Sequence, residues 1–159
     1  MYPHPLILYT TAIKPEWLDY NQHMNVAYYL LIFDLAMEEL LRSLGLGEKA
    51  ARNRNISVMV LEAHILYDRE VSLGQTVEVS AQLVDHDRKR LHLYLEMHVQ
   101  GGGGYRAARL EQLLLGVDLK QRRAASFPED VMTGITRLAQ CHAGLARPES
   151  LGRTIGIRR

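Results

Sequence analysis

The chain has 159 residues, 47% of them hydrophobic and 23% charged, which is the size and composition of one globular domain with its own core. A formal net charge of +1 gives no general attraction to nucleic acid or to a membrane surface, so we expect neither as a partner. The single cysteine, Cys141, excludes a framework of intramolecular disulfides. We find no leader pattern and no apolar run of about eighteen residues, and we therefore expect a cytoplasmic protein.

The first predicted element is a strand at residues 6–13, where β-branched and aromatic side chains are enriched, and Pro15 ends it. A long helix is predicted at residues 25–44, because apolar side chains recur every three or four positions and Gly45 is placed to end it. Further apolar residues cover the other sides of this helix, which is more than a helix on the surface of a domain needs. We therefore expect other elements to wrap around it.

Four more stretches, joined by connections of hairpin length, have the character of strands. They lie at residues 56–67, 75–84, 90–99 and 105–119. In the stretch 90–99, apolar and polar residues alternate, which is the period of a sheet with one buried face. A short helix is predicted in FPEDVMTGITRLAQ, with Pro128 near its first turn.

These elements predict an α+β fold with no internal repeat and no linker. One antiparallel five-stranded sheet wrapped around the long central helix buries both the apolar helix and the one-faced strands. We assign residues 1–141 to a single domain. Residues 142–159 are poor in apolar periodicity and rich in Arg and Gly, so we expect a C-terminal tail of low order.

The stretch DYNQHMNVAYY places Asp19, Asn21 and His23 two residues apart in front of the long helix. In an extended segment such side chains project to one side at intervals of roughly 6.5 Å, so the three could line one wall. The helix N-terminus that follows offers free backbone N–H groups to a developing oxyanion. Two interpretations stay open here. The stretch is either a catalytic wall, or a turn closed by Asp19 and Asn21 with Asn25 as the helix cap.

Other side chains that carry chemistry have equally ordinary explanations. An aromatic group around the polar stretch could cage a quaternary ammonium, although aromatic residues on a helix more often pack in the core. This group is Trp17, Tyr20, Tyr28 and Tyr29. Basic residues in two predicted turns suit phosphate binding, although short charge runs more often mark solvated turns. These are Arg88, Lys89, Arg90, Arg122 and Arg123. The histidines are too widely spaced for one metal shell, and we predict no metal site. Glu70, in the charged stretch YDRE between two strands, is by itself more typical of a solvated surface.

These motifs together carry a resemblance to a known family. Strand, Asp-x-Asn-x-His-Met-Asn-x-x-Tyr-Tyr, long helix and four strands resemble, over about residues 5–132, the hotdog-fold acyl-CoA thioesterases of the 4-hydroxybenzoyl-CoA thioesterase superfamily. More narrowly, DYNQHMNVAYY, YDREVSLGQTVEV, EQLLLGVDL and RRAASFPEDV are similar to the betainyl-CoA thioesterases of carnitine degradation. Plant acyl-carrier-protein thioesterases share Asp-x-Asn-x-His and a later Tyr-x-Arg-Glu. The resemblance thus implies a catalytic site of Asp19, Asn21, His23 and Glu70.

The resemblance implies hydrolysis of a small acyl-CoA thioester such as betainyl-CoA, with no cofactor and no metal, in a homodimer or a dimer of dimers with sites between subunits. Asp19 or Glu70 would act as general base or as nucleophile, while Asn21 and His23 orient water or carboxylate. The thioester oxygen would be held and positioned by Asn25, Val26 and Ala27. The aromatic group would line the acyl pocket, and the basic residues would bind the CoA phosphates.

Three alternatives remain open at this point. Some members of the superfamily carry an aspartate where Asn21 stands, so the carboxylate could be Asp19, Glu70 or, with weaker support, Glu38 or Glu39 on the helix. Enoyl-thioester hydratases and dehydratases of the same fold resemble Gly-Asp-x-Asn-Pro-x-His, whose proline and spacing this chain lacks. A non-catalytic acyl-CoA-binding protein is the third alternative, although the short tail offers no regulatory appendage.

Overall fold

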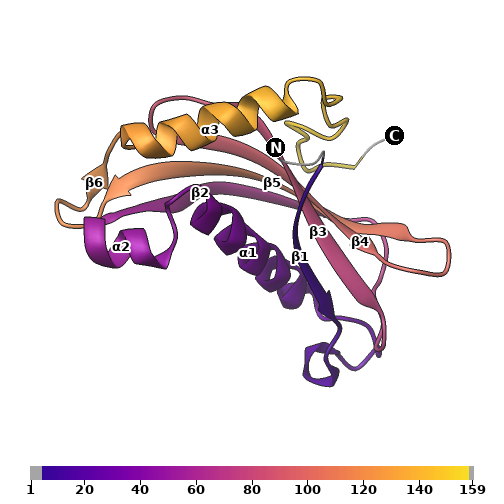
Figure 1. Cartoon of the computed structure of the whole chain (residues 1–159). Coiled ribbons are helices and arrows are strands. Elements are labelled where there is room, and N and C mark those ends of the chain that lie inside the picture. The colour runs from indigo at the N-terminus through magenta and orange to yellow at the C-terminus, as the bar shows by residue number, and fades with distance from the viewer. Residues whose placement is uncertain (1–4, 158–159) are drawn as a thin grey trace.

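The computed structural model describes residues 5–157, in which a curled antiparallel sheet packs against one long helix (Figure 1). The elements are β1 (Leu6–Ala12), the short η1 (Pro15–Trp17), α1 (Val26–Ser43), α2 (Glu48–Arg54), β2 (Ile56–Tyr67), β3 (Thr76–His86), β4 (Arg90–Val99), β5 (Tyr105–Asp118), β6 (Arg123–Ala124) and α3 (Glu129–His142). Across the sheet the strands are ordered β1-β3-β4-β5-β2, and the short β6 pairs with β5. The predicted α+β architecture is confirmed, with β6 as an additional strand.

The connection from β2 to β3 differs from the predicted hairpin. β2 lies at the far edge of the sheet and pairs along its length with β5, so residues 68–75 cross the ends of two strands to reach β3. Strands lie about 4.8 Å apart, and this connection is long enough to span two of them, whereas a tight hairpin needs about two residues. Between α1 and β2, where no element was predicted, the chain forms α2, which buries a single side chain, Ala50.

One face of α1 is buried against the sheet, and the other remains apolar and exposed. The buried face includes Ile32, Phe33, Ala36, Met37 and Leu40. The exposed face includes Val26, Leu30, Leu31 and Leu35, which are 37–56% exposed. The sequence suggested that the sheet would wrap around the whole helix. In the single chain the sheet covers only one face of it. No helix within residues 5–157 is long and apolar enough to cross a membrane.

Helix α3 covers the part of β3 that β1 leaves unpaired. The pairing of β1 with β3 ends at Leu6 and Ala81, so the next N–H groups of β3 need other acceptors. The buried ring of His142, the last residue of α3, accepts the N–H of Leu83 through Nδ1 at 2.8 Å. A side chain at a helix end thus completes the hydrogen bonding of an exposed strand edge.

Residues 143–157 form no helix or strand, and part of this segment lies on the face of the sheet opposite α1 (Figure 1). Three successive strands contact it. Gln82 of β3 donates to the carbonyl of Ala146 at 3.3 Å, and Tyr94 of β4 hydrogen-bonds to Ser150 at 2.6 Å. On β5, Glu111 accepts the N–H of Gly152 at 2.8 Å. The domain boundary after residue 141 and the low order of the tail stay predictions.

Replacing His142 by alanine is expected to lower the free energy of unfolding by about 1–3 kcal/mol, because the N–H of Leu83 would be left buried without its acceptor. Urea denaturation followed by circular dichroism measures the loss. The matched control is His64→Ala, which removes a half-buried histidine from β2 and should cost less than about 0.5 kcal/mol. Equal losses in the two variants would contradict the role assigned to His142.

Candidate active site

The polar stretch before α1 folds as a tight turn and not as an extended segment, so of the two interpretations that the sequence left open the backbone follows the turn. The carbonyl of Asp19 accepts the N–H of Gln22 at 3.0 Å, and the N–H of Asp19 donates to the carbonyl of His23 at 3.0 Å. Gln22 has a φ of 63°, in the left-handed region that few residues other than glycine adopt. The carboxylate of Asp19 accepts the N–H of Asn21 at 2.8 Å and so closes its own turn.

Glu70 is the predicted catalytic residue that the structure brings to this turn. Its Oε1 lies 3.5 Å from Nε2 of His23. The backbone is fixed on both sides of the contact, because His23 forms a bridge with Ser72 and the N–H of Met24 donates to the carbonyl of Val71 at 2.7 Å. The side chains of His23 and Glu70 are 38% and 66% exposed, so both are open to a ligand.

The loop that carries Glu70 is anchored to the beginning of β5, one of the two strands that it crosses. The N–H groups of Asp68 and Arg69 both donate to the carbonyl of Ala107 on β5, at 2.9 and 3.1 Å. The hydroxyl of Tyr105, the first residue of β5, donates to the carbonyl of Glu70 at 2.8 Å. The backbone of Glu70 is therefore fixed while its side chain remains free to reach His23.

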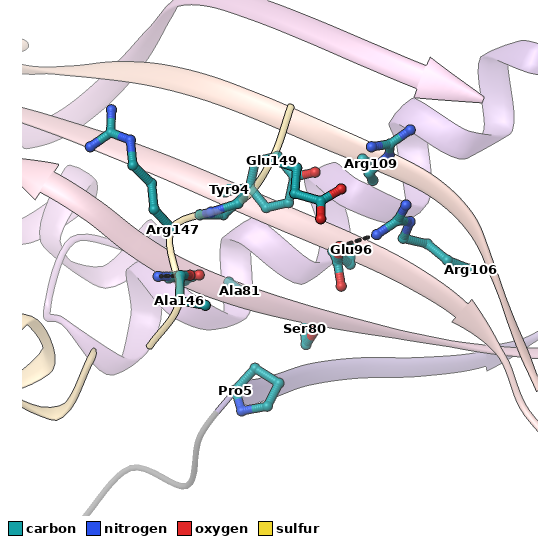
Figure 2. Close-up of a pocket in the computed structure, with 12 residues that line it drawn as sticks. Pro5, Ser80, Ala81, Tyr94, Glu96, Arg106, Arg109, Ala146, Arg147 and Glu149 are labelled. Carbon is teal, nitrogen blue, oxygen red and sulfur yellow. Dashed lines mark hydrogen bonds and ion pairs between the residues drawn. The ribbon is translucent and has the colours of Figure 1, made fainter. Parts of the chain in front are cut away.

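A charged cavity lies on the face of the sheet opposite α1 (Figure 2). Arg106 donates to Glu96 and to Asp68, each at 2.9 Å, and Arg109 also pairs with Asp68. Burial opposes the charge of Arg106, but the two carboxylates outweigh it and raise its pKa. None of the predicted site residues lines this cavity. Two of its lining residues, Arg106 and Arg109, hold the Glu70 loop through Asp68.

The N-terminus of α1 keeps one free donor among the groups predicted to hold an oxyanion. The side chain of Asn25 accepts the N–H of Ala27 at 3.0 Å, and its carbonyl accepts the N–H of Tyr28. Asn25 is thus the helix cap, and its own N–H donates to the carbonyl of Trp17 at 2.9 Å. The N–H of Val26 has no acceptor among residues 5–157, and it lies at the positive end of the helix.

The four predicted aromatic residues do not form one cage. Trp17 is buried and stacks on Tyr28, with ring centroids 5.7 Å apart, and the amino group of Lys14 lies 5.0 Å from the centre of the Trp17 ring. Tyr20 is 91% exposed at the turn. Tyr29 is separate from this pair, because its ring meets that of Tyr67 edge-on at 5.2 Å.

Tyr29 and Tyr67 belong to a second aromatic group next to Glu70. Burial raises the pKa of Tyr29, a backbone hydrogen bond from Val71 opposes the rise, and Tyr105, Glu70 and Tyr67 add to it. The pairing of Tyr29 with Tyr67 was not predicted from the sequence. The available signal was Tyr67 itself, which opens the stretch that carries Glu70.

The five predicted basic residues lie in neighbouring turns at the end of the sheet that is far from Glu70. The carbonyl of Lys89 accepts the N–H of Gly116 at 2.7 Å, so the β3–β4 turn packs against the end of β5 that precedes Arg122 and Arg123. Arg90 pairs with Asp87; this hydrogen bond lowers the pKa of Asp87 to about 2 and raises that of Arg90. Twelve-residue β2 separates this end from Glu70 by about 36 Å within one chain.

The remaining carboxylates considered from the sequence are engaged elsewhere on α1. Glu38 accepts the N–H of Glu48 at 3.3 Å, and Glu39 pairs with Arg42 in the last turns of the helix. Within residues 5–157, no three His, Cys, Asp or Glu side chains lie close enough to hold a metal ion.

Comparisons with known proteins concern the whole chain. A model of the thioesterase-like superfamily matches residues 13–135. A betainyl-CoA thioesterase of Pseudomonas aeruginosa is 40% identical over 152 residues, which cover 96% of this chain and 95% of the relative. An L-carnitine dehydrogenase/betainyl-CoA thioesterase of Rhizobium meliloti is 34% identical over 98% of this chain and 31% of its own length. A Staphylococcus aureus protein solved in complex with CoA superposes with a TM-score of 0.90 at 31% identity, covering 99% of this chain and 98% of that one.

Proposed function

The chain belongs to the thioesterase-like superfamily, has the hotdog fold and is an acyl-CoA thioester hydrolase, and we propose that it cleaves betainyl-CoA to betaine and free CoA. The similarity to the Pseudomonas aeruginosa relative extends over nearly the whole of both chains, which supports this substrate. The observation that carries the proposal is the contact of Glu70 with His23 beside the N-terminus of α1. The cytoplasmic location expected from the sequence stays a prediction.

Glu70 is the proposed general base. Its carboxylate takes a proton from water as the water oxygen attacks the carbonyl carbon of the thioester. The electron pair of the carbonyl moves onto its oxygen, which accepts a hydrogen bond from the N–H of Val26. When the carbonyl re-forms, the carbon–sulfur bond breaks, and the CoA thiolate takes the proton from Glu70. Water is the second reactant, and Glu70 begins and ends the cycle as a carboxylate, so the step balances.

The other predicted catalytic residues receive supporting roles. His23 lies close enough to orient the carboxylate of Glu70. Asp19 and Asn21 shape the turn that positions His23, because the carboxylate of Asp19 is hydrogen-bonded inside that turn. This division of roles favours Glu70 over Asp19 as the reacting carboxylate.

We further propose that two copies of the chain pair through their β2 strands. β2 is an edge strand of twelve residues, and its centre exposes Met59, Val60 and Leu61 by about half. A long apolar edge of this kind is a template for pairing with another strand. A groove between α1 and β2, lined by Met37, Val60 and their neighbours, continues this surface onto the helix. A second copy would cover the exposed apolar face of α1 as well.

Antiparallel pairing of β2 would also bring the turn that carries Arg122 and Arg123 in one chain close to residues 19–23 of the other, called the catalytic turn below. The Ile56 end of one strand would lie beside the Tyr67 end of its partner. Ile56 pairs with Asp118, just before the turn that carries Arg122 and Arg123. We propose that Arg122 and Arg123 of the partner subunit bind the CoA phosphates. Within residues 5–157, neither Arg122 nor Arg123 forms an ion pair, so both side chains are available to bind phosphate.

The double substitution Arg122→Gln and Arg123→Gln is therefore expected to raise the KM for an acyl-CoA about tenfold with little change in kcat, because charge-assisted hydrogen bonds to phosphate are lost. The matched control is the same acyl group on pantetheine, which carries no phosphate and whose KM should not change. Equal changes in KM for the two substrates, or none for either, would contradict phosphate binding by this pair.

Release of free thiol from a panel of acyl-CoAs, betainyl-CoA included, tests the proposed reaction. Betainyl-CoA should have the highest kcat/KM of the panel. Failure to release thiol from any member would refute thioester hydrolysis. Rapid cleavage of other members with none of betainyl-CoA would refute the proposed substrate alone.

A further inference from the structure

The acyl group of the proposed substrate places a fixed positive charge next to the bond that is cleaved. A single methylene group separates the trimethylammonium nitrogen from the thioester carbonyl carbon. Any surface that binds this cation must therefore border the carboxylate that activates water. Quaternary ammonium groups are bound by the faces of aromatic rings, and a nearby carboxylate adds to the attraction.

Several aromatic rings near the catalytic turn already have partners. The ring of Trp17 contacts the amino group of Lys14, which lies 5.0 Å from its centroid, and it also stacks on the ring of Tyr28. The guanidinium of Arg69 lies 4.3 Å from the centroid of Tyr105. A substrate cation would have to displace a cation of the protein at either ring. These rings are therefore poor candidates.

Tyr67 has the exposure and the neighbours that such a surface needs. In the single chain Tyr67 is 48% exposed, and its ring meets the ring of the buried Tyr29 edge-on, with an interplanar angle of 87°. Glu70 follows Tyr67 by three residues in the chain, and its charge adds to the rise in the pKa of Tyr29. The backbone of Tyr67 is fixed, because it is the last residue of β2 and pairs with Ala108 of β5.

Building on the proposed hydrolysis of betainyl-CoA, we infer that the face of the Tyr67 ring binds the trimethylammonium group, with Tyr29 as its rigid backing and Glu70 as the counter-charge. Tyr67 is then the residue that selects a quaternary ammonium acyl group over a neutral one of the same shape. Glu70 contributes to the same selection while it activates water. The tyrosine hydroxyl is not required for this role, because the ring face supplies the attraction.

The test compares betainyl-CoA with tert-butylacetyl-CoA, in which carbon replaces nitrogen and the shape is unchanged. For each enzyme, kcat/KM on the charged substrate is divided by kcat/KM on the neutral one. The positive charge also activates the carbonyl, but this intrinsic effect cancels when variants are compared with the wild type. Tyr67→Leu should lower the ratio about tenfold. Tyr67→Phe keeps the ring and should keep the ratio.

The outcomes separate this inference from the proposed function. If the wild type cleaves neither substrate, the proposed function fails. If the wild type cleaves betainyl-CoA and Tyr67→Leu leaves the ratio unchanged, the inference is overturned while the function stands. Equal losses on both substrates would also overturn it, because they would show a structural role for the ring. A lower ratio in Tyr28→Leu but not in Tyr67→Leu would assign the cation to the Trp17–Tyr28 pair instead.

Discussion

Glu70→Gln is expected to lower kcat for thioester hydrolysis about a hundredfold to ten-thousandfold, the range of a positioned general base. The amide keeps the shape of the side chain and cannot take the proton from water. The side chain of Glu70 is 66% exposed, and its one ionic contact within residues 5–157 is with His23. The variant should therefore fold normally, which thermal denaturation checks alongside thiol release.

Asp19→Asn is the matched control for this substitution. An asparagine side chain has a carbonyl oxygen that can still accept the N–H of Asn21, so the turn should survive. We expect a loss in kcat of less than about tenfold, because a residue that shapes the turn acts on the reaction only through His23. A large loss in Asp19→Asn with none in Glu70→Gln would transfer the role of base to Asp19.

The sequence predicts the elements of this fold better than their pairing. β2 and β4 have the predicted bounds, because alternation and flanking polar residues define a strand locally. The place of β2 beside β5 depends on contacts between distant segments, which no local pattern contains. Helix α2 could not be predicted because the local pattern is itself missing. The helix buries one side chain, so its sequence has no apolar periodicity.

The candidate site shows the same division between local and distant information. The residues of the polar stretch could be identified from the sequence, but their geometry depends on the left-handed backbone of Gln22, an uncommon conformation for this residue type. Glu70 could be linked to His23 only through the family resemblance, since the loop between β2 and β3 first had to cross the sheet. Tyr67 had no such guide. Its importance follows from where β2 ends, next to Tyr29 of α1.

Leu61→Lys is expected to convert a dimer into monomers and to raise the KM for an acyl-CoA at least about tenfold, because each site would lose Arg122 and Arg123 of the neighbouring chain. Leu61 is the extra residue of a bulge, lying between Val60 and Glu62 without a partner on β5. Its side chain is 51% exposed, so a lysine there should leave the single chain folded. Size-exclusion chromatography with light scattering measures the mass of the assembly, and thiol release measures the activity.

The matched control lies on the opposite edge of the sheet. Ile7 of β1 is 53% exposed, so Ile7→Lys adds the same charge at a similar exposure on the other edge strand. If β2 is the interface, Ile7→Lys stays dimeric and active, and raising the concentration of Leu61→Lys restores part of its activity by mass action. A monomeric Leu61→Lys with full activity would show that one chain holds a complete site. Monomers formed by Ile7→Lys and not by Leu61→Lys would place the interface at β1, and Arg122 and Arg123 could then no longer reach the catalytic turn of a partner through paired β2 strands.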